Sequence, residues 1–123
     1  MLLKGAFSVS KDELLLGLIT ELRRGTLTLA VLGCLSGPRY GYSLLQEMED
    51  KGVRVEANTL YPLLRRLETQ GLLESVWKTD AAKPRKYYQI TALGADILEA
   101  LKNHWTNTVD SVNTLLGGNE SET

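Results

Sequence analysis

The spacing of apolar residues changes at Gly71, and this change limits the folds that the chain can adopt. Before it, four leucines recur at helical spacing within residues 58–70, at Leu60, Leu63, Leu64 and Leu67. After it, residues 72–78 and 85–90 are rich in β-branched and aromatic side chains, which favours two strands of a β-hairpin joined by the loop "TDAAKP". A short helix followed directly by a hairpin is typical of a winged helix-turn-helix.

Other patterns predict further helices on both sides of this unit. Ser10 to Glu13 spells a capping box, so a helix is expected over residues 11–24. A second apolar segment, 26–38, is expected to form a buried helix that ends at Gly37 and Pro38, and a third helix is expected over 41–51. The fold class is therefore mainly α (α+β), a winged helix-turn-helix with a two-stranded β wing.

The chain length of 123 residues suits one such domain with extensions. Residues 1–24 are interpreted as an N-terminal extension and helix that lie in a dimer interface. Residues 25–91 form the predicted winged helix-turn-helix, and Thr91 is a candidate N-cap for a long dimerisation helix within 92–118. Residues 119–123 are expected to be a disordered tail.

Charge is unevenly distributed although the formal net charge is only −1. Residues 58–90 hold six Lys and Arg against three Asp and Glu, whereas residues 91–123 hold one against five. A local basic surface, and hence a nucleic-acid partner, is compatible with this balance. The single cysteine, and the lack of a signal peptide or a membrane-length apolar run, lead us to expect a cytoplasmic protein without a membrane partner.

The polar face of the predicted helix 58–70 carries residue types that suit a DNA groove. Asn and Arg can bond base edges with two hydrogen bonds, and Tyr or Thr can reach phosphate or a thymine methyl. The simpler alternative is a solvated surface helix. The candidate DNA-binding residues on this helix are Asn58, Thr59, Tyr61, Arg65 and Arg66, with Thr69 on the same face.

The predicted hairpin adds cations at or around its loop. They would contact a phosphate backbone, although exposed loops also hold lysines for solubility. These candidates are Lys78, Lys83, Arg85 and Lys86. On the same strands, Tyr88 and Ile90 are expected to join Val76 over the core, with Tyr87 nearer to solvent.

The long C-terminal helix has an apolar stripe close to a heptad repeat, which predicts a partner helix. The economical partner is a second copy of the chain, and the alternative is that the helix folds back on its own domain. The residues expected in the dimer interface are Leu15, Leu18, Leu22, Leu98, Leu101, Trp105, Val109, Val112 and Leu116. Trp105 could also stack on a flat aromatic ligand between subunits.

Catalysis has little support in the sequence. His104 lacks an evident carboxylate partner, and Cys34 lies in an apolar segment where a thiol acts as a small hydrophobe. No metal site, cofactor or nucleophile motif is predicted, so the chain is not expected to be an enzyme.

Four blocks resemble, in order, the PadR family of winged-helix transcriptional regulators. They are "RGTLTLAVLGCLS", "YGYSLLQEME", "ANTLYPLLRRLETQGLLES" and "PRKYYQITALG". The match covers about residues 24–95, and the single C-terminal helix is similar to that of the smaller subfamily. The N-terminal extension of about 24 residues departs from its shortest members.

The resemblance implies homodimers that repress transcription from a palindromic operator on double-stranded DNA, often until a small aromatic or amphipathic compound releases them. It also implies that residues 61–66 enter the major groove, that the wing at 83–86 touches backbone, and that Trp105 lines a cavity between subunits. Two alternatives remain open at this stage: an effector-binding module whose main role is ligand capture, and a winged helix used for protein contacts.

Overall fold

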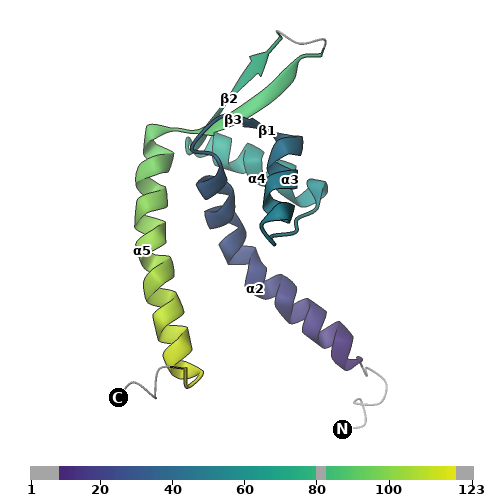
Figure 1. Ribbon diagram of the computed structural model, residues 1–123, viewed down its shortest axis with the longest axis vertical. Helices are drawn as coiled ribbons and strands as arrows, with labels where there is room; N and C mark the ends of the chain where they lie inside the picture. The colour runs from purple at the N-terminus through teal and green to yellow at the C-terminus, as the bar shows by residue number, and fades with distance from the viewer. Residues whose placement is uncertain (1–8, 80–82, 119–123) are drawn as a thin grey trace.

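The computed structural model describes residues 9–79 and 83–118, which form four helices and a three-stranded sheet. The helices are α2 (Lys11–Cys34), α3 (Gly41–Asp50), α4 (Ala57–Thr69) and α5 (Ala92–Leu115), and the strands are β1 (Arg39–Tyr40), β2 (Leu73–Lys78) and β3 (Arg85–Ile90). The β2–β3 hairpin projects from one end of a globular part, while α2 and α5 extend from it in the opposite direction (Figure 1). The predicted mainly α fold with a β wing is confirmed. The predicted tail at 119–123 and the centre of the hairpin loop lie outside the described residues.

Helix α2 is longer than the sequence patterns predicted. It begins with the expected capping box, in which the Ser10 and Glu13 side chains each accept a hydrogen bond from the other residue's backbone N–H, both at 3.1 Å. It then continues to Cys34, so the prediction of one helix ending at 24 and another over 26–38 is wrong. Gly25 does not break the helix, because one glycine costs only about 1 kcal/mol relative to alanine. The expected boundary at residue 24 therefore falls inside one continuous helix.

The inner half of α2 packs against α3 and α5, and its buried residues join those of α4 in one core. The leucines of α4 that recur at helical spacing are all buried, as are residues from α2, α3 and the sheet. The buried hydrophobic residues are Val31, Leu32, Leu35, Leu44, Met48, Leu60, Leu63, Leu64, Leu67, Leu73 and Tyr88. This core fixes the position of α4 and leaves its opposite face at the surface.

The sheet has the strand order β1–β3–β2, and all pairings are antiparallel. Strand β1, which the sequence patterns did not predict, places Tyr40 opposite Tyr87. Val76 also lies opposite Tyr87 and is 49% exposed, so the expectation that it joins Tyr88 over the core is wrong. Because side chains alternate between the faces of a strand, Val76 shares a face with Tyr87, whereas Ser75 is paired with Tyr88.

The start of α5 is locked against the base of the hairpin. The Thr91 hydroxyl accepts a hydrogen bond from the Gly94 N–H at 2.9 Å and donates one to the Gly71 carbonyl at 2.7 Å. A Cβ on Gly94 would lie 2.2 Å from the Leu72 carbonyl oxygen, so only glycine allows this approach. The direction in which α5 leaves the globular part is therefore set by the segment that links α4 to β2.

Candidate nucleic-acid interface

The outer face of α4 is solvent-exposed along its length. The leucines of its opposite face are buried in the core. Five of the six polar-face residues lie at the surface: Asn58, Thr59, Arg65, Arg66 and Thr69. Within the described ranges, no carboxylate lies at ion-pair distance from Arg65 or Arg66. Both guanidinium groups are therefore available to an external acceptor such as a base edge or a phosphate.

Tyr61, the sixth residue of this face, has a different environment. It is half-buried and packs against the start of α3, where a Cβ built on Gly41 would lie 2.3 Å from the Tyr61 ring. The ring thus fills the junction between α3 and α4 and does not project freely from α4. Sequence spacing alone could not separate Tyr61 from Arg65, because the contact with Gly41 depends on how the two helices cross.

Two wing cations lie over aromatic rings on one face of the sheet. Lys78 and Arg85 are paired across β2 and β3. The Lys78 ammonium lies 5.0 Å from the centroid of the Tyr87 ring, and the Arg85 guanidinium lies 4.7 Å from that of Tyr40. The two rings contact each other edge-on, with their centroids 5.7 Å apart. These contacts hold the two charges on the same face of the hairpin and leave them at the surface.

Lys86 belongs to the other face of the hairpin. Its ammonium lies 3.7 Å from the Glu68 carboxylate at the end of α4 and 5.3 Å from the centroid of Tyr88. The same carboxylate accepts a hydrogen bond from the Ser75 hydroxyl of β2. Part of the Lys86 charge is thus balanced within the protomer, and Glu68 ties α4 to both wing strands. Lys83, in contrast, is fully at the surface near the tip.

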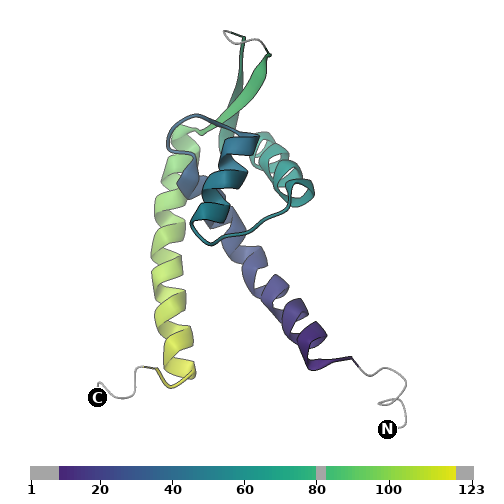
Figure 2. The ribbon, with the colours of Figure 1, turned by 45° about the vertical axis from the view of Figure 1, so that its right-hand side comes forward.

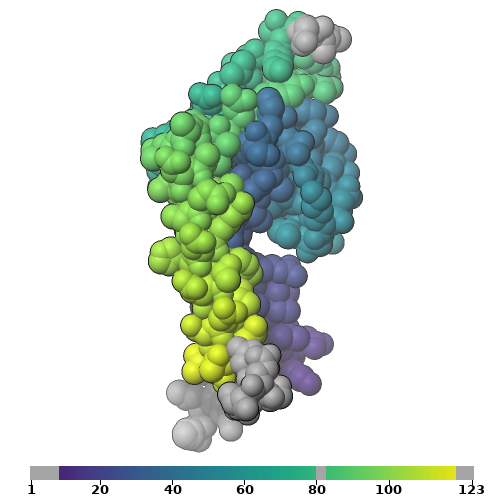
Figure 3. All heavy atoms as spheres, turned by 60° about the vertical axis from the view of Figure 1, so that its left-hand side comes forward, coloured from purple at the N-terminus to yellow at the C-terminus, as the bar shows by residue number. Residues whose placement is uncertain are grey.

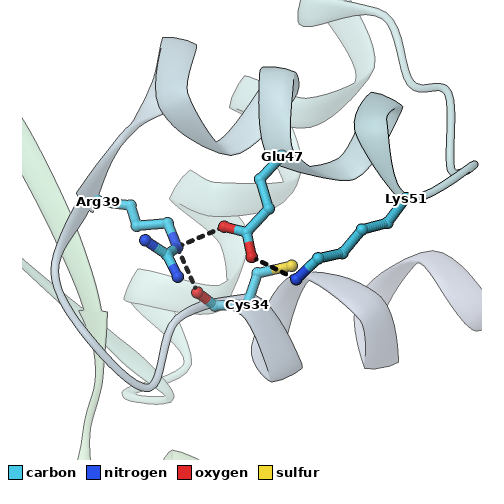
Figure 4. Close-up of polar contacts among 4 residues, drawn as sticks. All are labelled: Cys34, Arg39, Glu47 and Lys51. Carbon is cyan, nitrogen blue, oxygen red and sulfur yellow. Dashed lines mark hydrogen bonds and ion pairs between the residues drawn. The ribbon is translucent and has the colours of Figure 1, made fainter.

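A polar cluster joins the end of α2 to α3 (Figure 4). The Arg39 Nε donates to the Cys34 carbonyl at 2.9 Å and contacts the Glu47 carboxylate at 2.6 Å, and the Lys51 ammonium donates to Glu47 at 2.9 Å. The hydrogen bond from Lys51 lowers the pKa of Glu47, and the same bond raises the pKa of Lys51. Burial, followed by the charge of Glu47, raises the pKa of the Cys34 thiol, which therefore favours the neutral form.

The residues expected at a dimer interface divide into two groups. Leu98, Leu101 and Val109 are half-buried, and the first two pack against the core of their own protomer. The remaining six are exposed and lie on the parts of α2 and α5 that extend beyond the core: Leu15, Leu18, Leu22, Trp105, Val112 and Leu116. Figure 2 shows these two helical arms diverging from the globular part.

A cavity of about 700 Å³ lies between α2, the segment joining α3 to α4, and Trp105 of α5. Leu27, Ala30 and Val53 supply apolar walls, and Arg24 and Arg54 are among its polar lining residues. The space-filling view shows a notch between the outer half of α2 and the globular part (Figure 3). The cavity volume falls within the range of small-molecule sites, of roughly 300–1,000 Å³.

No helix in the described ranges is long and apolar enough to cross a bilayer. Among the same residues, no three His, Cys, Asp or Glu side chains converge as metal ligands would.

Comparison with known proteins places this geometry among transcriptional regulators. The model of the transcriptional regulator PadR-like family matches residues 29–103. The crystal structure of a PadR family transcriptional regulator from Eggerthella lenta is 48% identical with a TM-score of 0.81, and the match covers 85% of this chain and 94% of that one. A PadR-like transcriptional regulator from Bacillus cereus is 34% identical with a TM-score of 0.72, over 80% and 98% of the two chains. An uncharacterised protein of Lysinibacillus sphaericus is 31% identical over 82% of this chain and 97% of its own length.

Proposed function

The chain belongs to the PadR-like family of transcriptional regulators, and from this premise we propose that it represses transcription as a homodimer bound to a palindromic operator. Members of the family regulate transcription by binding DNA, so the chain is a DNA-binding regulator and not an enzyme.

The observation that carries the DNA-binding assignment is the joining of a polar helix face to a cationic wing. Arg65 and Arg66 on α4 have no internal carboxylate partner among the described residues, and Lys78 and Arg85 are held in a row on the hairpin. We assign base contacts to the exposed face of α4, with Asn58, Thr59 and Arg65 as the leading candidates. Phosphate contacts are assigned to the wing, with Lys83 and Arg85 as the strongest candidates.

The homodimer is supported by the apolar arms. Leu18 and Leu22 are 62% and 75% exposed, and Trp105 of α5 is 45% exposed. Clusters of exposed large apolar residues on a small protein mark an interaction surface. A second copy of the chain would supply a complementary arm by two-fold symmetry, and it would present two copies of α4 about 34–36 Å apart.

Selection of bound fragments from random duplex DNA tests these assignments together. We expect a palindromic consensus whose half-sites are separated by about one helical turn. A consensus with a single half-site would contradict the dimeric arrangement. Retention of no duplex at low salt would contradict DNA binding by this surface.

Repression itself needs a transcriptional readout. When the selected sequence overlaps the promoter of a reporter, expression of the chain should lower reporter output. Arg65→Ala should restore that output while leaving the thermal unfolding of the protein unchanged, because Arg65 is exposed. An increase in output on expression of the parent would identify an activator.

A second proposal is that a small aromatic or amphipathic effector binds beside Trp105 and releases the DNA. The apolar walls of the 700 Å³ cavity and the exposed indole support it. Planar aromatic compounds should quench tryptophan fluorescence in the parent and in Trp77→Phe, but not in Trp105→Phe. Quenching that survives in Trp105→Phe would place ligand binding elsewhere.

A further inference from the structure

A second, smaller cleft lies where α4 meets the wing. It has a volume of about 300 Å³ and is formed by β1, the start of α3, α4 and β3. Its lining residues are Tyr40, Gly41, Tyr42, Tyr61, Arg85, Lys86 and Tyr88. We propose that this cleft holds one phosphate group of the DNA backbone, a role that rests on the proposed DNA-binding function and adds Tyr40 and Tyr42 to the interface.

The charge of the cleft favours an anion. Arg85 and Lys86 both line it, and no carboxylate does. Because Glu68 balances part of the Lys86 charge from outside the cleft, Arg85 supplies the main free charge. The Arg85 guanidinium is held 4.7 Å above the Tyr40 ring, and no Asp or Glu of the described ranges is within ion-pair distance of it. A guanidinium that is oriented by an aromatic ring and lacks an internal acceptor is preorganised for an oxyanion.

The phenol groups supply neutral donors around the same space. Tyr40, Tyr42 and Tyr61 come from three different elements, and their hydroxyls make no hydrogen bond within the described ranges. A phenol can donate its proton to a phosphate oxygen, and hydrogen bonds to a charged acceptor are stronger than those between neutral groups. Tyr42 is 59% exposed, so its hydroxyl can reach an external phosphate.

Gly41 makes the convergence of these groups possible. Its Cα lies so close to Tyr61 that a Cβ would be 2.6 Å from the phenol oxygen and 2.3 Å from a ring carbon. Any side chain at this position would displace the Tyr61 ring and separate α3 from α4. The close contact brings the Tyr61 phenol beside Tyr40 and Tyr42, which flank Gly41 in the chain.

The cleft is smaller than the 700 Å³ cavity beside Trp105. At about 300 Å³ it is at the lower limit of small-molecule sites, and Tyr61 is its lining residue from α4. A single phosphate held there would set the register of α4 in the groove, because contacts to phosphate fix the position and orientation of a protein on the duplex.

The test pairs single-atom changes in the protein with single-phosphate changes in DNA. The duplex recovered by selection is prepared with one neutral methylphosphonate at each backbone position in turn. Affinity is measured for the parent, Tyr42→Phe and Tyr40→Phe. The matched control is Tyr87→Phe, which removes a wing phenol that does not line the cleft and keeps the ring under Lys78.

Tyr42→Phe should weaken binding to the unmodified duplex by roughly tenfold, as expected for one hydrogen bond to a charged group. Neutralising one particular phosphate in each half-site should weaken the parent and Tyr87→Phe, but should cause a clearly smaller further loss in Tyr42→Phe. This non-additivity would identify the phosphate held in the cleft. If each methylphosphonate weakens binding by the same factor in the parent, Tyr42→Phe and Tyr40→Phe, the proposal is overturned, whereas DNA binding itself is not. Failure of the parent to bind any duplex would instead overturn the proposed function.

Discussion

The globular part and the two helical arms use the same residue, leucine, in opposite environments. In the globular part, Leu60 and Leu64 of α4 are fully buried. In the arms, Leu22 of α2 is 75% exposed and Leu116 at the end of α5 is 77% exposed. The core therefore satisfies its apolar surface within one protomer, whereas the arms require a second surface. Both environments occur along one continuous α2, whose inner half packs in the core and whose outer half does not.

This difference separates folding from assembly. A change in the core should act on the free energy of unfolding of each protomer, and a change in the arms should act on self-association. The wing and the α2–α3 junction belong to neither group. Both are held at the edge of the core by polar contacts. Substitutions in the core, the arms, the wing and the α2–α3 junction should therefore have effects of different size on different measured quantities.

The largest effect is expected in the core. Leu64→Ala should lower the free energy of unfolding by about 2–5 kcal/mol, because it removes a buried side chain and leaves a cavity. Chemical denaturation followed by circular dichroism measures this change. Leu116→Ala is the matched control and should leave the protomer's stability nearly unchanged; a loss as large as that of Leu64→Ala would remove the distinction between core and arms.

The arms should respond mainly through assembly. Leu18→Glu combined with Leu22→Glu should weaken self-association by at least about a hundredfold, since each buried leucine contributes roughly 1.5–3 kcal/mol. Sedimentation equilibrium measures the association constant, and far-ultraviolet circular dichroism should report an unchanged helix content. Glu21→Ala, on the same helix, is the control. If the double variant associates as strongly as the parent, the dimer does not use this arm.

The wing should show a smaller effect that separates charge from position. Neutralising Lys83 and Arg85 should weaken binding to all duplexes and reduce the salt dependence by about two counterions per protomer, or about four per dimer. Glu68→Gln should instead preserve the salt slope and lower the affinity modestly, because it loosens the hold of α4 on Ser75 and Lys86. Salt titrations of DNA affinity distinguish the two outcomes. An increased affinity of Glu68→Gln would show that Lys86 acts mainly as a free phosphate contact.

The smallest effect is expected at the junction of α2 with α3. Because the folded-state pKa of Glu47 is lowered, its stabilising contribution is present above the ordinary value of 4.5 and is lost as the pH falls through the lowered value. The difference in melting temperature between the parent and Glu47→Gln should therefore be constant near neutral pH and shrink in acid. Thermal unfolding across this range measures it; a difference that grows in acid would contradict the assignment. For Lys51 the sign is opposite, since its raised pKa gives a contribution that is lost only at strongly alkaline pH.

Much of the fold could be predicted from local patterns. The capping box at Ser10, the leucine spacing of α4 and the β-rich segments of the hairpin each lie within a few residues. The first gave the start of α2 but not its end, and the other two gave the expected elements. The polar face of α4 followed from the same spacing, because a helix with buried leucines on one side must expose the residues between them. Four sequence blocks predicted membership of the PadR family, and the match of the family model to residues 29–103 confirms it.

The contacts between these elements could not be predicted in the same way. The sequence patterns did not decide whether a helix ends near Gly25, which lies within α2 in the structure, and β1 exists only because β3 lies beside it. Lys86 and Arg85 are neighbours in sequence, but one faces Glu68 and the other lies over Tyr40.

The sequence by itself determined the start of α2, the helices α3, α4 and α5, the two wing strands and the sign of the charge on the wing, because helical and strand periodicity and composition are properties of neighbouring residues. The continuation of α2 through Gly25 and the presence of β1 were not determined in this way. Only the tertiary structure decided which cations remain free and which tyrosines meet at Gly41. Those outcomes depend on packing between segments that are distant in the chain, where a few tenths of a nanometre separate a neutralised charge from one that is available to DNA.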